Sequence, residues 1–170
     1  MPSATPVRPT RTAPTWSAGG EGEQLWFLGT LAIVRVPGEA LGGRFSLTEL
    51  VLRRHTSPAL HTHPQDESYV VLEGLLTVRA GSERFQLSAG GAAAIPMGVP
   101  HTFRVDSESA HILLISTPAG IERFVLDASV PARAPTLPPA NAPRPTPQEV
   151  ARIYTEHACI EVGPRLEPDD

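Results

Sequence analysis

The middle of the chain, residues 25–117, is a succession of short apolar segments separated by turns that contain glycine or proline. The segments are rich in β-branched residues and too short for ordinary helices, which favours strands. Many short strands in close succession are typical of an antiparallel sandwich or barrel. The strands are expected at residues 25–36, 44–52, 67–73, 75–80, 83–87, 92–95, 101–105 and 110–117, with one more around His61 and His63.

The segments on either side lack this pattern. Residues 1–24 are rich in Pro, Thr and Arg without a hydrophobic period, which predicts a flexible arm. After Pro118 the apolar residues Ile121, Phe124 and Val125 recur at helical spacing, which predicts a short helix on the outside of the barrel. We therefore expect an arm at 1–24, a strand-rich domain at 25–128 and a separate C-terminal region at 129–170.

The C-terminal region is expected to contain one helix. Residues 131–147 are rich in proline and predict an extended connection. The sequence Thr146-Pro147-Gln148-Glu149 matches a capping box with proline at the first helical position, so a helix is predicted over about residues 147–158. Residues 161–170 are predicted to be an acidic tail. The apolar stripe of the helix must dock on its own barrel or on a neighbouring subunit, and it consists of Val150, Ile153, Tyr154 and His157.

Composition argues against several classes of function. The net charge of −4 provides no basic face for nucleic acid. The single cysteine, Cys159, cannot form an internal disulfide. The longest apolar run, residues 25–34, is shorter than the roughly 20 residues that span a bilayer, and residues 1–20 lack the apolar centre of a secretory signal. We therefore expect a cytoplasmic protein with neither a nucleic-acid partner nor a membrane partner.

The residues with the most distinctive chemistry are His61, His63 and Glu67. Side chains alternate along a strand, so His61 and His63 point to one side. Glu67 has the same parity and faces the same way if the strand resumes in register after Pro64. Imidazole and carboxylate together suit a divalent transition-metal ion. A further ligand would be a histidine that the fold brings alongside, and the candidates are His55, His101, His111 and His157.

Two motifs in this chain resemble those of the cupin superfamily. The first has the spacing H-x-H-x3-E-x6-G and consists of His61, His63, Glu67 and Gly74. The second has the spacing G-x5-P-x-G-x2-H and consists of Gly90, Pro96, Gly98 and His101. The resemblance covers residues 25–128. It implies an all-β fold, the double-stranded β-helix or jelly-roll barrel of the cupins, with short helices C-terminal to the barrel.

The same resemblance implies one divalent transition-metal ion held by His61, His63, Glu67 and His101. The donor set does not distinguish Fe, Mn, Ni, Co, Cu and Zn. Glu67 is the candidate catalytic residue, because it could leave the metal and accept a substrate proton as a general base. The candidate substrate-pocket residues are Phe27, Tyr69 and Phe103.

Other residues depart from the family pattern or are set aside. His55 stands where a glycine usually opens the first motif, and Val105 stands where an asparagine usually closes the second. His55 and His111 are expected to be structural or surface residues, although the parity of His111 would allow it to reach the interior. His157 and Cys159 lie two residues apart, so they are not expected to form a nucleophilic pair.

The segments around Trp26-Phe27-Leu28-Gly29 and residues 117–124 are similar to those of single-domain cupins of the quercetin dioxygenase type. This similarity implies an oxygenase that acts on an enolisable aromatic small molecule with O₂. A metal-dependent isomerase, epimerase or cyclase would need the same ligands without O₂. A small-molecule-binding protein without turnover is a further alternative. The family resemblance also makes a homodimer the expected assembly.

Overall fold

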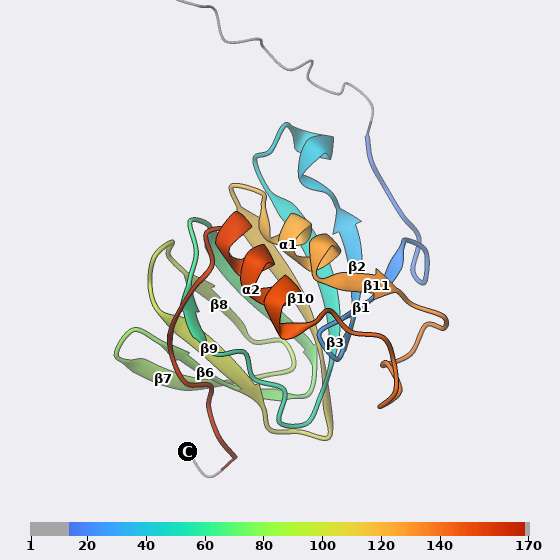
Figure 1. Ribbon diagram of the computed structural model, residues 1–170. Helices are drawn as coiled ribbons and strands as arrows, with labels where there is room; N and C mark the ends of the chain where they lie inside the picture. Colours follow the sequence, from blue (N-terminus) through green and yellow to red (C-terminus); the bar gives the residue numbers. More distant parts are fainter. Residues whose placement is uncertain (1–13, 169–170) are drawn as a thin grey trace, which may run out of the picture.

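The computed structural model describes residues 14–168, and its core is a barrel made of two antiparallel sheets (Figure 1). The strand order is β11-β1-β2-β3-β10-β5-β8 in the seven-stranded sheet and β12-β4-β9-β6-β7 in the five-stranded sheet. The strands are β1 Gln24–Phe27, β2 Thr30–Val36, β3 Ser46–Arg53, β4 Leu60–Thr62, β5 Asp66–Glu73, β6 Leu75–Ala80, β7 Glu83–Ser88, β8 Ala92–Ile95, β9 His101–Val105, β10 Ser109–Thr117, β11 Ser129–Pro131 and β12 Ile160–Gly163. The all-β prediction is confirmed.

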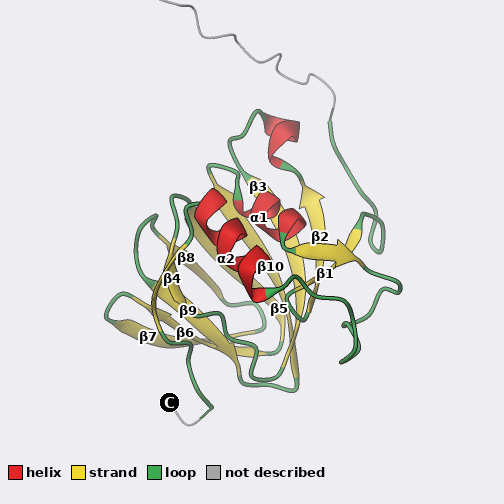
Figure 2. Ribbon diagram, viewed as in Figure 1, coloured by secondary structure: helices red, strands yellow, loops and turns green. Residues whose placement is uncertain are grey.

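The helices are short, and two of them follow the barrel strands. The 3-10 helix η1 spans Gly38–Leu41, and the α-helices are α1, Ile121–Asp127, and α2, Pro147–Glu156. Helices α1 and α2 lie together against the barrel (Figure 2). No helix in the described range 14–168 is long and apolar enough to cross a membrane.

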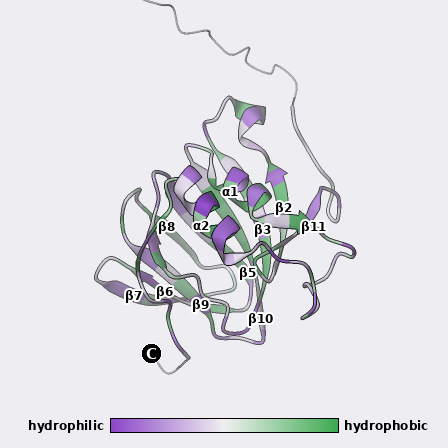
Figure 3. Ribbon diagram, viewed as in Figure 1, coloured by the Kyte–Doolittle hydropathy of each residue, from purple (hydrophilic) through white to green (hydrophobic). Residues whose placement is uncertain are grey.

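Because side chains alternate between the two faces of each strand, one face of the sheet forms the core. Along β3 and β10, every second residue is buried, and Leu50 of β3 lies opposite Ile112 of β10. The intervening residues face outward, and His111 is one of them, so it does not reach the interior. Figure 3 shows hydrophobic residues along β2 and β3, whereas α2 is mainly hydrophilic. This helix buries only Ile153, so it covers the barrel as an amphipathic lid rather than as part of the core.

The structure differs from the sequence prediction at both ends of the barrel. Residues 25–36 form a hairpin rather than one strand, because Leu28 and Gly29 both have positive φ, at 46° and 96°, and reverse the chain. Leucine is an unusual turn residue, so the sequence did not reveal this turn. The short strand β11, which pairs with β1, was also missed.

The C-terminal region docks on its own barrel. The predicted capping box is present, with the Thr146 hydroxyl accepting a hydrogen bond from the Glu149 N–H. The ring of Tyr154 contacts Phe124 of α1 edge-on, with centroids 5.2 Å apart. The prediction of an acidic tail from residue 161 is wrong in part, because β12 pairs with β4 and places Glu161 opposite His61.

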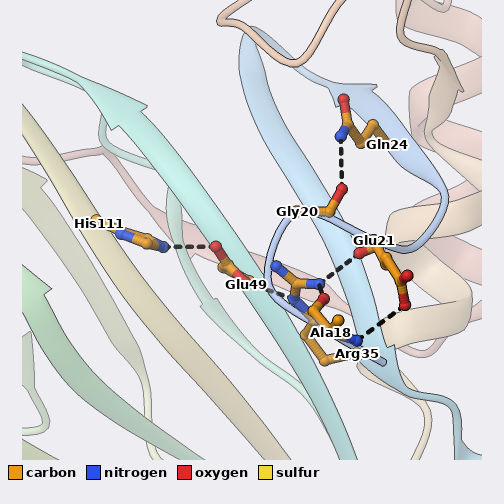
Figure 4. A network of polar contacts seen from close by, with 7 residues as sticks. All are labelled: Ala18, Gly20, Glu21, Gln24, Arg35, Glu49 and His111. Carbon is orange, nitrogen blue, oxygen red and sulfur yellow. Dashed lines mark hydrogen bonds and ion pairs between the residues drawn. The ribbon is translucent and has the colours of Figure 1, made fainter. Parts of the chain in front are cut away.

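A polar network fastens the N-terminal segment to the outer face of the seven-stranded sheet (Figure 4). Glu49 of β3 accepts hydrogen bonds from Arg35 at 2.5 Å and from His111 at 2.7 Å. Arg35 also donates to the backbone carbonyls of Ala18 and Glu21. The predicted flexible arm lies partly outside the described residues, and its described part is held by these contacts.

Replacing Glu49 with glutamine is expected to lower the free energy of unfolding by about 1–3 kcal/mol at neutral pH, because two charge-assisted hydrogen bonds are weakened. Burial by itself would raise the pKa of Glu49, but the hydrogen bonds from Arg35 and His111 outweigh it and hold that pKa below its ordinary 4.5. A lowered folded-state pKa contributes stability above the unfolded-state pKa, and this contribution is lost as the pH falls through the folded value.

The difference between the parent and Glu49→Gln should therefore shrink on acidification, measured by urea unfolding at neutral pH and at about pH 3. Glu39→Gln is the matched control, because Glu39 forms an exposed ion pair with Arg123 and should contribute almost nothing. A stability difference that persists unchanged in acid would contradict this account of Glu49.

Candidate metal centre

Three histidines and one carboxylate converge where the two sheets meet. One candidate ligand atom from each side chain lies within 4.8 Å of all the others, and the group consists of His61, His63, Glu67 and His101. Strand β4 pairs with β9 in the five-stranded sheet, which sets His61 opposite His101. Glu67 comes from β5 of the other sheet. The strand therefore does not resume in register after Pro64; instead, the chain crosses between sheets, and the barrel curvature brings the side chains together.

Glu67 is the centre of the hydrogen bonds in this cluster. Its Oε2 accepts hydrogen bonds from His63 Nε2 at 2.6 Å and from His101 Nε2 at 2.9 Å. Tyr69 also forms a hydrogen bond with Glu67, and burial together with this contact raises the pKa of Tyr69. Burial acts to raise the pKa of Glu67, but the hydrogen bonds from His101 and His63 dominate and lower it well below its ordinary range. The carboxylate is consequently ionised although it is almost fully buried.

The imidazoles are held from behind by backbone carbonyls. His61 Nδ1 donates to Ala59 O at 2.7 Å, and His101 Nδ1 donates to Val99 O at 2.9 Å. These bonds place the Nε2 atoms of both rings towards the cluster, as in metal sites whose outer hydrogen bonds orient the ligands. Burial, and then the nearby His101, lower the pKa of His61 to about 4, so its ring is neutral near pH 7. For His101, burial acts to lower the pKa, but hydrogen bonding to Glu67 raises it overall.

These residues fit a divalent transition-metal ion. The donor set has three ring nitrogens and a carboxylate, which is a combination that such ions accept. Among the described residues, the buried Nδ1 of His63 has no hydrogen-bond partner, so the hydrogen bonds of the protein alone do not satisfy the cluster. An ion would compensate the charge of Glu67 and use the nitrogen lone pairs. The cluster could therefore hold one metal ion.

A cavity of about 260 Å³ opens onto the cluster. The predicted pocket residues Phe27, Tyr69 and Phe103 all line it. Trp26 does not; it is buried and its indole N–H donates to Thr136 O. Most of the other walls are apolar.

The C-terminal half of the wall was missed at the sequence level. Helix α1 was expected on the barrel exterior, but its apolar residues face the cavity, and so do residues at the end of α2. The lining residues from these two segments are Ile121, Phe124, Val125, Tyr154, His157 and Cys159. In the sequence, the apolar stripe that includes Tyr154 and His157 indicated that one face of the helix would be buried. It did not indicate that this face would line the cavity.

Backbone conformation accounts for two positions of the first cupin-like motif: His55, which replaces the usual glycine, and Gly74, which matches the motif. His55 occupies the left-handed region with φ 64°, which is the conformation that glycine adopts most easily. At Gly74, with φ 94°, an added Cβ would lie 2.5 Å from the Ser109 carbonyl oxygen, so only glycine fits. His55 lies outside the metal cluster, and so does His111, which binds Glu49 on the outer face.

Comparison with known proteins agrees with this geometry. The model of the family described as "Cupin domain" matches residues 49–116. The chain is also similar to quercetin 2,3-dioxygenase of Bacillus subtilis, with 31% identity over 106 residues, which are 62% of this chain and 32% of that enzyme. The chain belongs to the cupin superfamily. An uncharacterized protein of Streptomyces coelicolor is 33% identical over 63 residues, which are 37% of this cupin and 60% of that protein. This cupin thus spans about a third of the first relative and three fifths of the second.

Solved structures show the same fold at low identity. An RmlC-like cupin from Shewanella frigidimarina superposes with a TM-score of 0.56 at 15% identity, covering 65% of this chain and 96% of that chain. KdgF from Halomonas sp. superposes with a TM-score of 0.55 at 17% identity, covering 63% and 94% respectively. These similarities establish the cupin barrel as the architecture.

Proposed function

We propose that this cupin is a metal-dependent dioxygenase of the quercetin 2,3-dioxygenase type, acting on an enolisable aromatic small molecule with O₂. The observation that carries the proposal is the His61, His63, Glu67 and His101 cluster at the end of a cavity with mainly apolar walls. The similarity to the Bacillus subtilis enzyme supports the reaction class. In this proposal the four side chains hold one divalent transition-metal ion.

The ion would supply a Lewis-acidic, redox-capable centre for oxygen donors. The protein holds its imidazoles ready for this, because the Ala59 and Val99 carbonyls fix the rings of His61 and His101. Three of the four side chains, those of His63, Glu67 and His101, are buried, which limits their contact with water.

Glu67 is the proposed general base. Its carboxylate accepts two imidazole N–H groups in the structure, and a ring nitrogen that gives its lone pair to an ion carries no proton to donate. Glu67 then retains Tyr69 as a hydrogen-bond partner and has a free lone pair for a proton. The proton that it would accept comes from the enol hydroxyl of the substrate.

The cavity walls favour a flat, aromatic substrate. Tyr69 and Phe103 contact each other edge-on, with ring centroids 5.6 Å apart, and Phe27 contacts Phe124 in the same manner at 5.7 Å. Such ring edges and faces pack well against an aromatic ligand, while the polar cluster orients its oxygen atoms.

The test is oxygen consumption by the metal-loaded protein in the presence of a flavonol such as quercetin. Oxygen uptake should accompany the loss of flavonol absorbance, and both should stop after the metal is removed with a chelator. Exchange of a substrate C–H proton with solvent, without oxygen uptake, would place the protein among the isomerases and overturn the dioxygenase proposal. Tight binding of the flavonol without any turnover would overturn it as well.

A further inference from the structure

Two hollows of the molecule meet at one thin wall. The first is the metal cavity of about 260 Å³, and the second is a surface groove of about 760 Å³ between α2 and β12. Two side chains, Tyr154 and Cys159, line both hollows. The metal cavity and the open groove therefore adjoin at these two residues.

The Tyr154 side chain packs against α1 at this wall. The Tyr154 ring touches Phe124 edge-on, at 5.2 Å between centroids and 80° between planes. In the part of the chain that the structure describes, no hydrogen bond fixes the Tyr154 hydroxyl. Its backbone, in contrast, is fixed, because Cys159 N donates to Tyr154 O at 2.9 Å.

The wall is also uncharged. Burial, and then the neighbouring Cys159 and Glu161, raise the pKa of Tyr154 to about 12. Burial raises the pKa of Cys159 to about 12 as well, with Glu67 and Glu161 adding to the effect. Both groups are neutral near pH 7, so the two residues that separate the hollows carry no charge, whereas Glu161 lines the groove beside them.

The surfaces on the two sides of the wall have similar chemistry. The groove side is built largely from apolar residues of α2 and β12, including Val150 and Ile160. The cavity side is built from the apolar residues of α1, including Phe124 and Val125. If the Tyr154 ring turned aside, the two apolar surfaces would be continuous.

We propose that Tyr154 is the gate between the groove and the metal cavity, and that it limits the size of the small molecule that passes from the groove to the metal centre. The groove between α2 and β12 is then an entrance to the cavity. That the passing molecule is a substrate rests on the function proposed above, whereas the gate itself depends only on the geometry of the two hollows.

The gate can be tested with a cysteine that only a molecule inside the cavity can reach. Val125 is almost fully buried, lines the metal cavity and lies outside the lining of the groove. Val125→Cys is introduced together with Cys159→Ser, which removes the single natural cysteine. The rate of reaction of the new thiol with N-ethylmaleimide, an uncharged reagent, is then measured in the full chain, without metal and without flavonol.

Tyr154→Ala, added to this background, is expected to increase the labelling rate about tenfold or more, because a gate closed for most of the time limits access in proportion to its open population. Tyr154→Trp is expected to slow labelling. Val150→Ala is the matched control, because Val150 lies on the same helix and lines only the groove, so it should leave the rate unchanged.

Equal labelling rates with Tyr, Ala and Trp at position 154 would overturn the gate, since the reagent would then enter elsewhere. An equal acceleration by Val150→Ala would also overturn it, because loosening of α2 would then explain the effect. If Tyr154→Ala does not fold, judged by circular dichroism, the comparison with Tyr154→Trp decides: slower labelling supports the gate and an unchanged rate refutes it. Failure of the flavonol assay would leave this result untouched.

Discussion

The His101→Ala variant is expected to retain less than about a tenth of the metal ion bound by the parent protein, because even outer-shell changes at metal sites cost roughly 10–100-fold in affinity. His101 is only 1% exposed, and its Nδ1 bond to Val99 holds the ring towards Glu67. Replacing it with alanine leaves three donors and a hole at the centre of the cluster. Metal content per protein chain is measured by elemental analysis of protein prepared without chelator.

Thermal unfolding provides a second measurement of the same loss. A ligand at one hundred times its Kd stabilises the folded state by about 2.7 kcal/mol, which for a chain of this size raises the Tm by about 5–10 °C. The parent should show a shift of this order on addition of its metal, and His101→Ala should show almost none. The control is His111→Ala, because His111 lies on the outer face and binds Glu49. Full metal content in His101→Ala, or equal loss in both variants, would refute the proposed ligand set.

Glu67→Gln is expected to lower kcat by about 100–10,000-fold, the range that a general base contributes. Glutamine has nearly the shape of glutamate, so it preserves the packing of this buried position, but it cannot accept the substrate proton in the same way. The three histidines remain and are expected to retain the ion at lower affinity. The variant is therefore assayed at saturating metal, with kcat and metal content measured on the same preparation.

Glu49→Gln makes the same chemical change on the outer face of the barrel, away from the metal cluster, and is expected to keep the parent kcat. If Glu67→Gln retained both its metal and its turnover, Glu67 could not be the base. If activity returned fully whenever metal was restored, the role of Glu67 would be that of a ligand alone. A low kcat in the metal-loaded variant is the result that separates proton transfer from metal binding.

The local features of this cupin were predictable because they follow from short-range physics. Alternation along a strand grouped His61 with His63, and a helical cap is encoded in the four residues from Thr146 to Glu149. The parity argument also selected Glu67, although it assumed a strand that continues past Pro64. The structure crosses there to the other sheet, so the prediction succeeded for a reason that differs from the geometry observed.

By itself, the sequence determined the strand-rich pattern and the grouping of His61 with His63, since alternation and turn residues act within a few positions of each other; the choice of His101 among the other histidines came from the resemblance to the cupin motifs. Only the tertiary structure decided which C-terminal residues line the cavity. An apolar stripe such as that of α2 shows that a face will be buried, but the hydrophobic effect is non-directional and does not specify the partner. The contact of Tyr154 with Phe124 and the pairing of β12 with β4 join residues far apart in the chain, and they alone place Tyr154 and Cys159 at the wall of the metal cavity.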